Sequence, residues 1–76
     1  MKNILIFGGS GKIGFDIAKY LYESGNNVII ADIKNNKNNK NFIKFIKCNI
    51  LIDKDIDLLI EKIFKLYNKI DSVIFC

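Results

Sequence analysis

The fold is decided by residues 3–14, which read NILIFGGSGKIG. After its first residue the run is apolar up to Phe7, as in a strand that is buried on both faces of a parallel sheet. Gly8 ends the run. From Ile13 apolar residues recur at helical spacing until Gly25, which stands where a helix commonly ends. Residues 3–25 therefore predict a buried strand, a glycine-rich turn and a helix.

The next segments add two strands and a loop. Residues 28–31 read VIIA and predict a second buried strand, which ends at Asp32 and completes a strand–helix–strand unit. Residues 34–41 contain only Lys and Asn and predict a loop. Residues 42–48 alternate between two faces and predict a third strand, half exposed at the edge of the sheet, where lysines discourage further pairing.

The second half of the chain predicts one more helix and one more strand. Asp53 is placed to cap a helix over residues 54–69, whose first turn carries acids that the helix dipole favours. The helix has an apolar stripe made of Ile56, Leu59, Ile60, Ile63, Phe64 and Tyr67. Residues 71–76 predict a fourth strand. Right-handed crossovers then give the strand order 3-2-1-4 with a helix on each face. The expected class is α/β, a partial Rossmann fold with a parallel sheet of about four strands.

The glycines have the spacing of a phosphate-binding turn. Gly8 permits a tight turn after the strand, Gly11 lets a pyrophosphate approach the backbone, and Gly14 lets the helix lie close to the sheet. The start of the helix offers N–H groups to the phosphates. Asp32 lies about 20 residues further on, where an acid accepts hydrogen bonds from ribose hydroxyls in dinucleotide-binding units. The alternative is a glycine-rich turn followed by a solvent-exposed aspartate.

The other common phosphate-binding motif does not fit this turn. A P-loop, GxxxxGK[ST], would align its Gly-Lys pair with residues 11–12 and would need glycine at position 6 and Ser or Thr at position 13. The chain has Ile6 and Ile13 at these positions. The turn therefore favours a dinucleotide.

The order of these segments resembles the short-chain dehydrogenase/reductase family over all 76 residues. Residues 8–14 are similar to the family's TGxxGxxG turn, with Phe7 in place of its Thr. Residues 31–33 are similar to its acid-ended second strand, and residues 47–50 to the element that contacts adenine. Residues 68–76 look like the helix end and strand that lead into its NNAG segment, whose two Asn are replaced by Phe and Cys.

The resemblance implies a nicotinamide dinucleotide and the residues that bind it. These cofactor-binding residues are Gly8, Ser10, Gly11, Lys12, Ile13, Gly14, Asp32, Ile33, Asn49 and Ile50. Asn49 stands where the family usually has Asp, and its amide can both donate to and accept from adenine. The carboxylate of Asp32 would repel the 2′-phosphate of NADP, whereas Lys12 and Lys34 could attract it. We expect NAD, with NADP as the alternative.

The resemblance also implies hydride transfer, but its catalytic residues are not in this chain. In the family a Tyr and a Lys lie four residues apart, and no Tyr-x-x-x-Lys occurs here. We therefore expect residues 1–76 to be a single, partial NAD(P)-binding domain, the N-terminal fragment of a short-chain oxidoreductase, with no catalytic residue of its own. The alternative is a non-catalytic nucleotide-binding or interaction module of the Rossmann type.

Composition limits the other functions. Without histidine the chain can form no histidine-based metal site and no Ser-His-Asp triad, and its two cysteines make no metal cluster, so we expect no metal. Both cysteines are expected to be small buried side chains. They end strands roughly 14 Å apart, too far for a disulfide. No apolar run reaches the ~18 residues of a membrane span, and no signal peptide is recognised, so we expect a cytoplasmic protein without membrane contact.

The net charge of +4 arises in one segment. Residues 1–33 balance and residues 48–76 carry four Lys against five acids, so all the excess comes from Lys34, Lys37, Lys40, Lys44 and Lys47. These lysines are spaced by Asn rather than by Arg or aromatic residues, which favours a solvated loop over the alternative of nucleic-acid binding. The fourth predicted strand has no covering helix in the chain. We expect either a homo-oligomer or a further C-terminal part to cover it.

Overall fold

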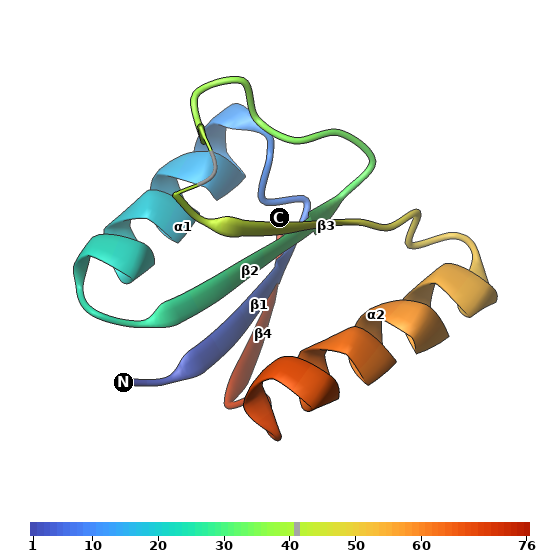
Figure 1. Ribbon diagram of the computed structural model, residues 1–76. Helices are drawn as coiled ribbons and strands as arrows, with labels where there is room; N and C mark the ends of the chain where they lie inside the picture. The colour runs from blue at the N-terminus through green and yellow to red at the C-terminus, as the bar shows by residue number, and fades with distance from the viewer. Residues whose placement is uncertain (41) are drawn as a thin grey trace.

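The computed structural model describes residues 1–40 and 42–76. In this part of the chain one parallel sheet contains β1 (Asn3–Phe7), β2 (Asn27–Asp32), β3 (Lys44–Lys47) and β4 (Ser72–Phe75), in the order β3-β2-β1-β4. Its helices are α1 (Lys12–Glu23) and α2 (Asp53–Tyr67), which lie on opposite faces of the sheet (Figure 1). The predicted partial Rossmann fold and its strand order are confirmed.

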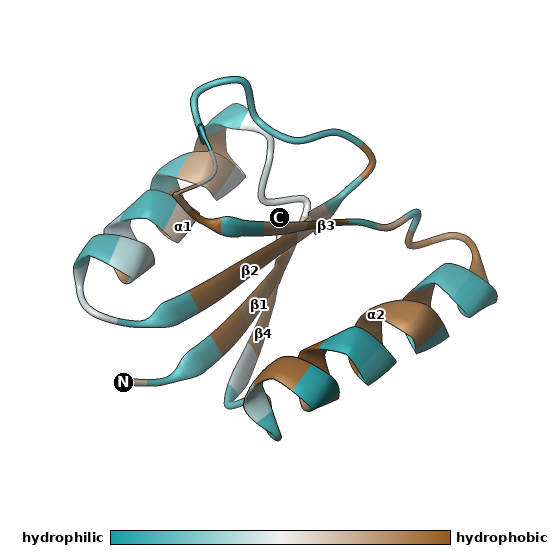
Figure 2. Cartoon of the chain, in the orientation of Figure 1, coloured by the Kyte–Doolittle hydropathy of each residue, from teal (hydrophilic) through white to brown (hydrophobic). Residues whose placement is uncertain are grey.

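Two apolar layers, one on each face of the sheet, hold the helices in place. On one face Leu59 and Ile63 of α2 are buried against the sheet. On the other face Ala18 of α1 is buried together with Ile43, which precedes β3. β1 is buried at all five of its positions, because it contributes to both layers. Figure 2 shows most of β1 and β2 as hydrophobic and most of the loop after β2 as hydrophilic. Burial of one such Leu or Ile side chain stabilises the fold by about 1.5–3 kcal/mol.

β3 forms the predicted edge strand, but it is shorter than predicted and begins at Lys44. The two residues before β3, Phe42 and Ile43, donate their backbone N–H groups to Asn39 and not to a neighbouring strand. The N–H of Phe42 donates to the backbone carbonyl of Asn39 (3.0 Å), and the N–H of Ile43 donates to its side-chain oxygen (2.8 Å). The register with β2 therefore starts at Lys44, opposite Ile29.

The predicted loop contains an unexpected buried residue. Over residues 34–40 the backbone forms turns and bends without a helix or strand, and Asn41 lies outside the described residues. Asn39 is only 1% exposed. Its side-chain nitrogen donates to the carbonyl of Ile43 (2.9 Å) and to the side-chain oxygen of Asn35 (3.0 Å). These bonds compensate for burying the amide, so the segment is anchored and not wholly solvated.

The second helix begins one residue earlier than predicted, and its predicted cap is wrong. Ile52 is the N-cap residue of α2 and Asp53 is its first residue. α2 ends at Tyr67 because Asn68 adopts a left-handed conformation, with φ of 67°. Phe64, predicted as part of the apolar stripe, is 45% exposed and lies outside the buried layer. In the described residues, no helix has the length and apolar character needed to cross a bilayer.

Polar bonds tie the amino-terminal ends of three strands together. The N–H of Asn3 donates to the carboxylate of Asp71 (2.7 Å), and the N–H of Asp71 donates to the carbonyl of Asn3 (2.8 Å). The side chain of Asn27 donates to that of Asn3 (2.9 Å). The hydrogen bond from Asn3 lowers the pKa of the Asp71 carboxyl, against a smaller opposing effect of desolvation. These bonds fix the amino-terminal ends of β1, β2 and β4, whereas the glycine turn lies at the carboxyl end of β1.

Candidate functional site

The carboxyl ends of the strands open onto a cavity of about 220 Å³. It lies at the point where the chain, after placing β2 and β3 on one side of β1, places β4 on the other side. Ligands bind at such reversal points in open α/β sheets. The predicted site residues in its lining are Gly8, Asp32, Ile33, Asn49 and Ile50.

The other five predicted residues form the glycine turn and the first turn of α1. Ser10 is partly buried, Gly14 is buried, and Gly11, Lys12 and Ile13 are exposed. Gly11 is the N-cap residue of α1. The first N–H groups of a helix have no carbonyl partner within it and carry a partial positive charge. This end of α1 can therefore receive an anion.

The three motif glycines differ in how far their geometry requires glycine. Gly8 has a φ of +76°, which L-residues rarely adopt. At Gly14 an added Cβ would lie 2.5 Å from the carbonyl oxygen of Gly8, so only glycine lets α1 approach the turn this closely. At Gly11 the nearest atom to an added Cβ is 3.8 Å away. This is an ordinary contact, and Gly11 is exposed, so its backbone leaves room for a phosphate.

Asp32 is held against the glycine turn. One of its carboxylate oxygens accepts the N–H of Ser10 (3.1 Å), and the other accepts the N–H of Ile33 (2.7 Å). The hydroxyl oxygen of Ser10 is buried and has no hydrogen-bond partner among the described residues. A buried polar atom without a partner is costly, and a ligand oxygen in the turn would supply one. The residues present thus fit the phosphate and ribose groups of a dinucleotide.

Two residues that the sequence analysis did not single out also shape the turn. The side chain of Asn36 donates to the carbonyl of Ser10 (2.8 Å). At Gly9 an added Cβ would lie 3.0 Å from side-chain carbons of Ile30, so the turn lies directly on β2. The sequence signal for Gly9 was its position directly after Gly8, and this signal is weak. Nothing in a segment of Lys and Asn distinguishes Asn36 from its neighbours.

An aromatic pair forms the part of the cavity nearest β1 and β4. Phe7 and Phe75 lie opposite each other in register, and their rings stack with centroids 5.1 Å apart and planes 8° apart. Both line the cavity. They also occupy positions where the chain differs from the family's Thr and Asn. Two of the differences from the pattern of the family that the chain resembles therefore contact each other.

The two cysteines at the cavity differ in exposure. Both are free thiols, and Cys48 is buried as expected, but Cys76 is exposed, so that expectation is wrong for Cys76. Burial raises the pKa of the Cys48 thiol, and the negative charge of Asp55 raises it further by a smaller amount.

The two thiols should differ in reactivity. Because the thiolate is the reactive form, we expect iodoacetamide at neutral pH to modify Cys76 and spare Cys48, and to modify both in urea. Peptide mass spectrometry measures this, and equal labelling without urea would contradict it.

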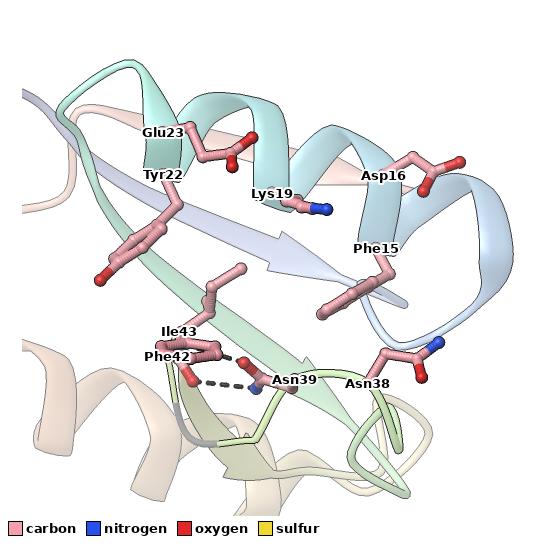
Figure 3. Close-up of a pocket in the computed structure, with 9 residues that line it drawn as sticks. All are labelled: Phe15, Asp16, Lys19, Tyr22, Glu23, Asn38, Asn39, Phe42 and Ile43. Atoms are coloured by element: carbon pink, nitrogen blue, oxygen red, sulfur yellow. Dashed lines mark hydrogen bonds between the residues drawn. The ribbon is translucent and has the colours of Figure 1, made fainter.

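A larger cavity of about 500 Å³ lies away from the strand ends, between α1 and the chain before β3. Figure 3 shows Phe15 and Tyr22 reaching toward it from α1, with Phe42 and Ile43 on the other side. Asn39 lies in its wall, where its polar atoms bond to Ile43 (Figure 3). The ten predicted site residues lie elsewhere, so this cavity is separate from the candidate site.

The family follows from the sequence match. Residues 2–76 match the family model for short chain dehydrogenase. The chain belongs to the short-chain dehydrogenase family. This membership confirms the resemblance stated above and implies an NAD(P) cofactor. No curated protein matches the chain.

Solved structures of several dehydrogenases contain the same fold. The ligand-free aldohexose dehydrogenase of Thermoplasma acidophilum is 25% identical with a TM-score of 0.90, over 99% of this chain and 29% of that one. A short chain dehydrogenase family protein of Francisella tularensis is 30% identical with a TM-score of 0.80, over 100% of this chain and 31% of that one. A monomeric L-threonine 3-dehydrogenase from a metagenome is 33% identical with a TM-score of 0.67, over 96% of this chain. The chain spans 22% to 31% of the length of these three proteins.

Proposed function

We propose that residues 1–76 form an NAD(P)-binding Rossmann domain that binds NAD at the carboxyl ends of its strands. The observation that carries the proposal is the glycine turn, where the open backbone of Gly11 and the unpartnered hydroxyl of Ser10 adjoin the start of α1. The pyrophosphate would lie against this turn. The N–H groups of Lys12, Ile13 and Gly14 would donate to it, because helix N-termini bind phosphates in this way.

The adenosine half of the cofactor is proposed to lie in the cavity beyond Asp32. The carboxylate of Asp32 would accept hydrogen bonds from the ribose hydroxyls. Ile33 and Ile50 are 55% and 45% exposed and would provide apolar contacts to adenine. The side-chain oxygen of Asn49 accepts the N–H of Leu51 (3.0 Å), which orients the amide. We propose that the amide nitrogen of Asn49 donates to a ring nitrogen of adenine.

The choice of NAD over NADP rests on the charge of Asp32. A carboxylate beside the ribose would repel a 2′-phosphate, and Lys12 and Lys34 would oppose this effect. We expect the wild-type protein to bind NAD more tightly than NADP. An Asp32→Asn variant should shift the ratio of the two dissociation constants toward NADP by about tenfold, which is about 1.4 kcal/mol.

Calorimetric titration with NAD and NADP tests this proposal. The matched control is Asp16→Asn, which removes the same charge from the exposed face of α1 and should leave the ratio unchanged. An unchanged ratio in Asp32→Asn would refute the assigned role of Asp32. If the wild-type protein binds neither dinucleotide, the proposed function itself is wrong.

The activity of the longer relatives is also a proposal for this chain. We propose that the domain serves a short-chain oxidoreductase that transfers hydride, with the catalytic Tyr and Lys supplied from outside these 76 residues. The alternative is a binding module without catalysis, and the exposed apolar side chains of Val73 (46%) and Phe75 (68%) on β4 favour a partner in that case. A defined oligomer in size-exclusion chromatography would support the module. Cytoplasmic location and the absence of metal and nucleic acid stay predictions.

A further inference from the structure

The backbone of Ser10 is held on both sides by side chains that end or follow β2. Its N–H donates to a carboxylate oxygen of Asp32 (3.1 Å), and its carbonyl accepts the side-chain N–H of Asn36 (2.8 Å). Asp32 and Asn36 thus hold the N–H and the carbonyl of Ser10, and this carbonyl belongs to the peptide bond between Ser10 and the exposed Gly11. The conformation of the glycine turn therefore depends on the chain after β2 as well as on its own glycines.

Asn36 is itself fixed in position. Its side-chain oxygen accepts the N–H of Asn38 (2.8 Å), so the side-chain nitrogen is the atom that faces Ser10. Its backbone carbonyl accepts the N–H of Asn39 (3.0 Å), and Asn39 is the buried anchor of this segment. Hydrogen bonds therefore connect the buried Ile43, which precedes β3, through Asn39 and Asn36 to Ser10 in the glycine turn.

Asp32 has two uses in the proposed site. Its carboxylate oxygen accepts the Ser10 N–H, and the proposed function also needs the carboxylate to accept ribose hydroxyls. A carboxylate has about four acceptor sites, so Asp32 can accept ribose hydroxyls while it keeps its bond to Ser10. The bond from Asn36 does not involve an atom that the cofactor needs, so it can persist with and without the cofactor.

We propose that Asn36 is a positioning residue, which keeps the Ser10–Gly11 peptide in the orientation that receives the cofactor phosphates. This inference rests on the proposed dinucleotide site. Asn36 touches neither phosphate nor ribose and acts through the carbonyl of Ser10. Its loss should therefore weaken cofactor binding without removing any group that contacts the cofactor.

The test compares two neighbouring asparagines by calorimetric titration with NAD. Asn36→Ala should raise the dissociation constant about tenfold, whereas the control Asn38→Ala, at an exposed position, should change it less than twofold. Asn36→Asp keeps the oxygen that accepts the Asn38 N–H and loses the donor to Ser10, so it should bind NAD as weakly as Asn36→Ala does. High salt screens the added negative charge, and the result should be the same there. Binding within twofold of wild type in Asn36→Ala would overturn the proposal.

A second measurement does not depend on the cofactor. Amide hydrogen exchange of the Ser10 N–H in the cofactor-free protein should be about tenfold faster in Asn36→Ala than in wild type or Asn38→Ala, because the turn loses one of its two fixed points. Unchanged exchange at Ser10 would refute the positioning role even if the wild-type protein bound no NAD. Absence of NAD binding with faster exchange would refute the proposed function and leave the role of Asn36 in the turn supported.

Discussion

A Gly14→Ala variant is expected to be destabilised by about 2–3 kcal/mol and to lose measurable NAD binding. An added Cβ would lie 2.5 Å from the carbonyl oxygen of Gly8 and 3.0 Å from the Cα of Gly9. Both obstacles are backbone atoms, which cannot rotate away, so α1 and the turn must separate. Alanine gains about 1 kcal/mol in helix propensity over glycine, which is less than the cost of this overlap.

Gly11→Ala is the matched control for Gly14→Ala, because it should weaken NAD binding with little loss of stability. Gly11 has a φ of −71° and a ψ of 171°, which alanine adopts freely, and the nearest atom to its Cβ is 3.8 Å away. We expect its stability to stay within about 1 kcal/mol of wild type, because the smaller entropy of the unfolded chain is offset by alanine being a poorer N-cap residue than glycine. The methyl group would occupy the space proposed for the pyrophosphate and weaken NAD binding.

Urea unfolding followed by circular dichroism, with titration of NAD into each variant, measures both effects. A Gly14→Ala protein as stable as wild type would show that α1 does not need this close approach. A Gly11→Ala protein that binds NAD normally would show that the phosphates lie elsewhere.

Asn39→Ala is expected to destabilise the protein by about 3 kcal/mol. The change removes the side-chain partners of the N–H and the carbonyl of Ile43, a residue that is 3% exposed. Each buried polar group left without a partner costs about 1–3 kcal/mol. Small domains have only roughly 0.05–0.15 kcal/mol of stability per residue, so this loss is a large share of the total for 76 residues.

Chemical unfolding and amide exchange of Ile43 measure this effect. Asn38→Ala, one residue earlier and exposed, makes the same chemical change and should alter stability by less than about 0.5 kcal/mol. Equal stabilities of the two variants would mean that the bonds of Asn39 contribute little. A larger loss in Asn39→Ala, with faster exchange at Ile43, is the expected result.

The elements that could be predicted from the sequence are those with a strong local pattern. The apolar run at residues 3–7 gave β1 with its observed bounds. Glycines with φ of +76° and +93° mark the turns at each end of α1. Chain connectivity and handedness then sufficed for the sheet order. The spacing of the motif glycines also located the turn that adjoins the cavity.

The parts that could not be predicted depend on contacts between distant segments. A segment made only of Lys and Asn has the same local preference at each Asn, so burial of Asn39 and the bond of Asn36 to Ser10 come from tertiary structure alone. The later start of β3 has the same origin, because Asn39 takes up the N–H groups of Phe42 and Ile43. Asp53 failed as a cap because Ile52 takes that position.

The stacked rings of Phe7 and Phe75 have a consequence for how the sequence can change over time. The two residues lie near opposite ends of the chain, yet they face each other on adjacent strands. Replacement of one ring by a small polar side chain would leave one face of the other ring without its partner. The two positions should therefore covary: relatives with a small polar residue at the first are expected to have lost the aromatic residue at the second.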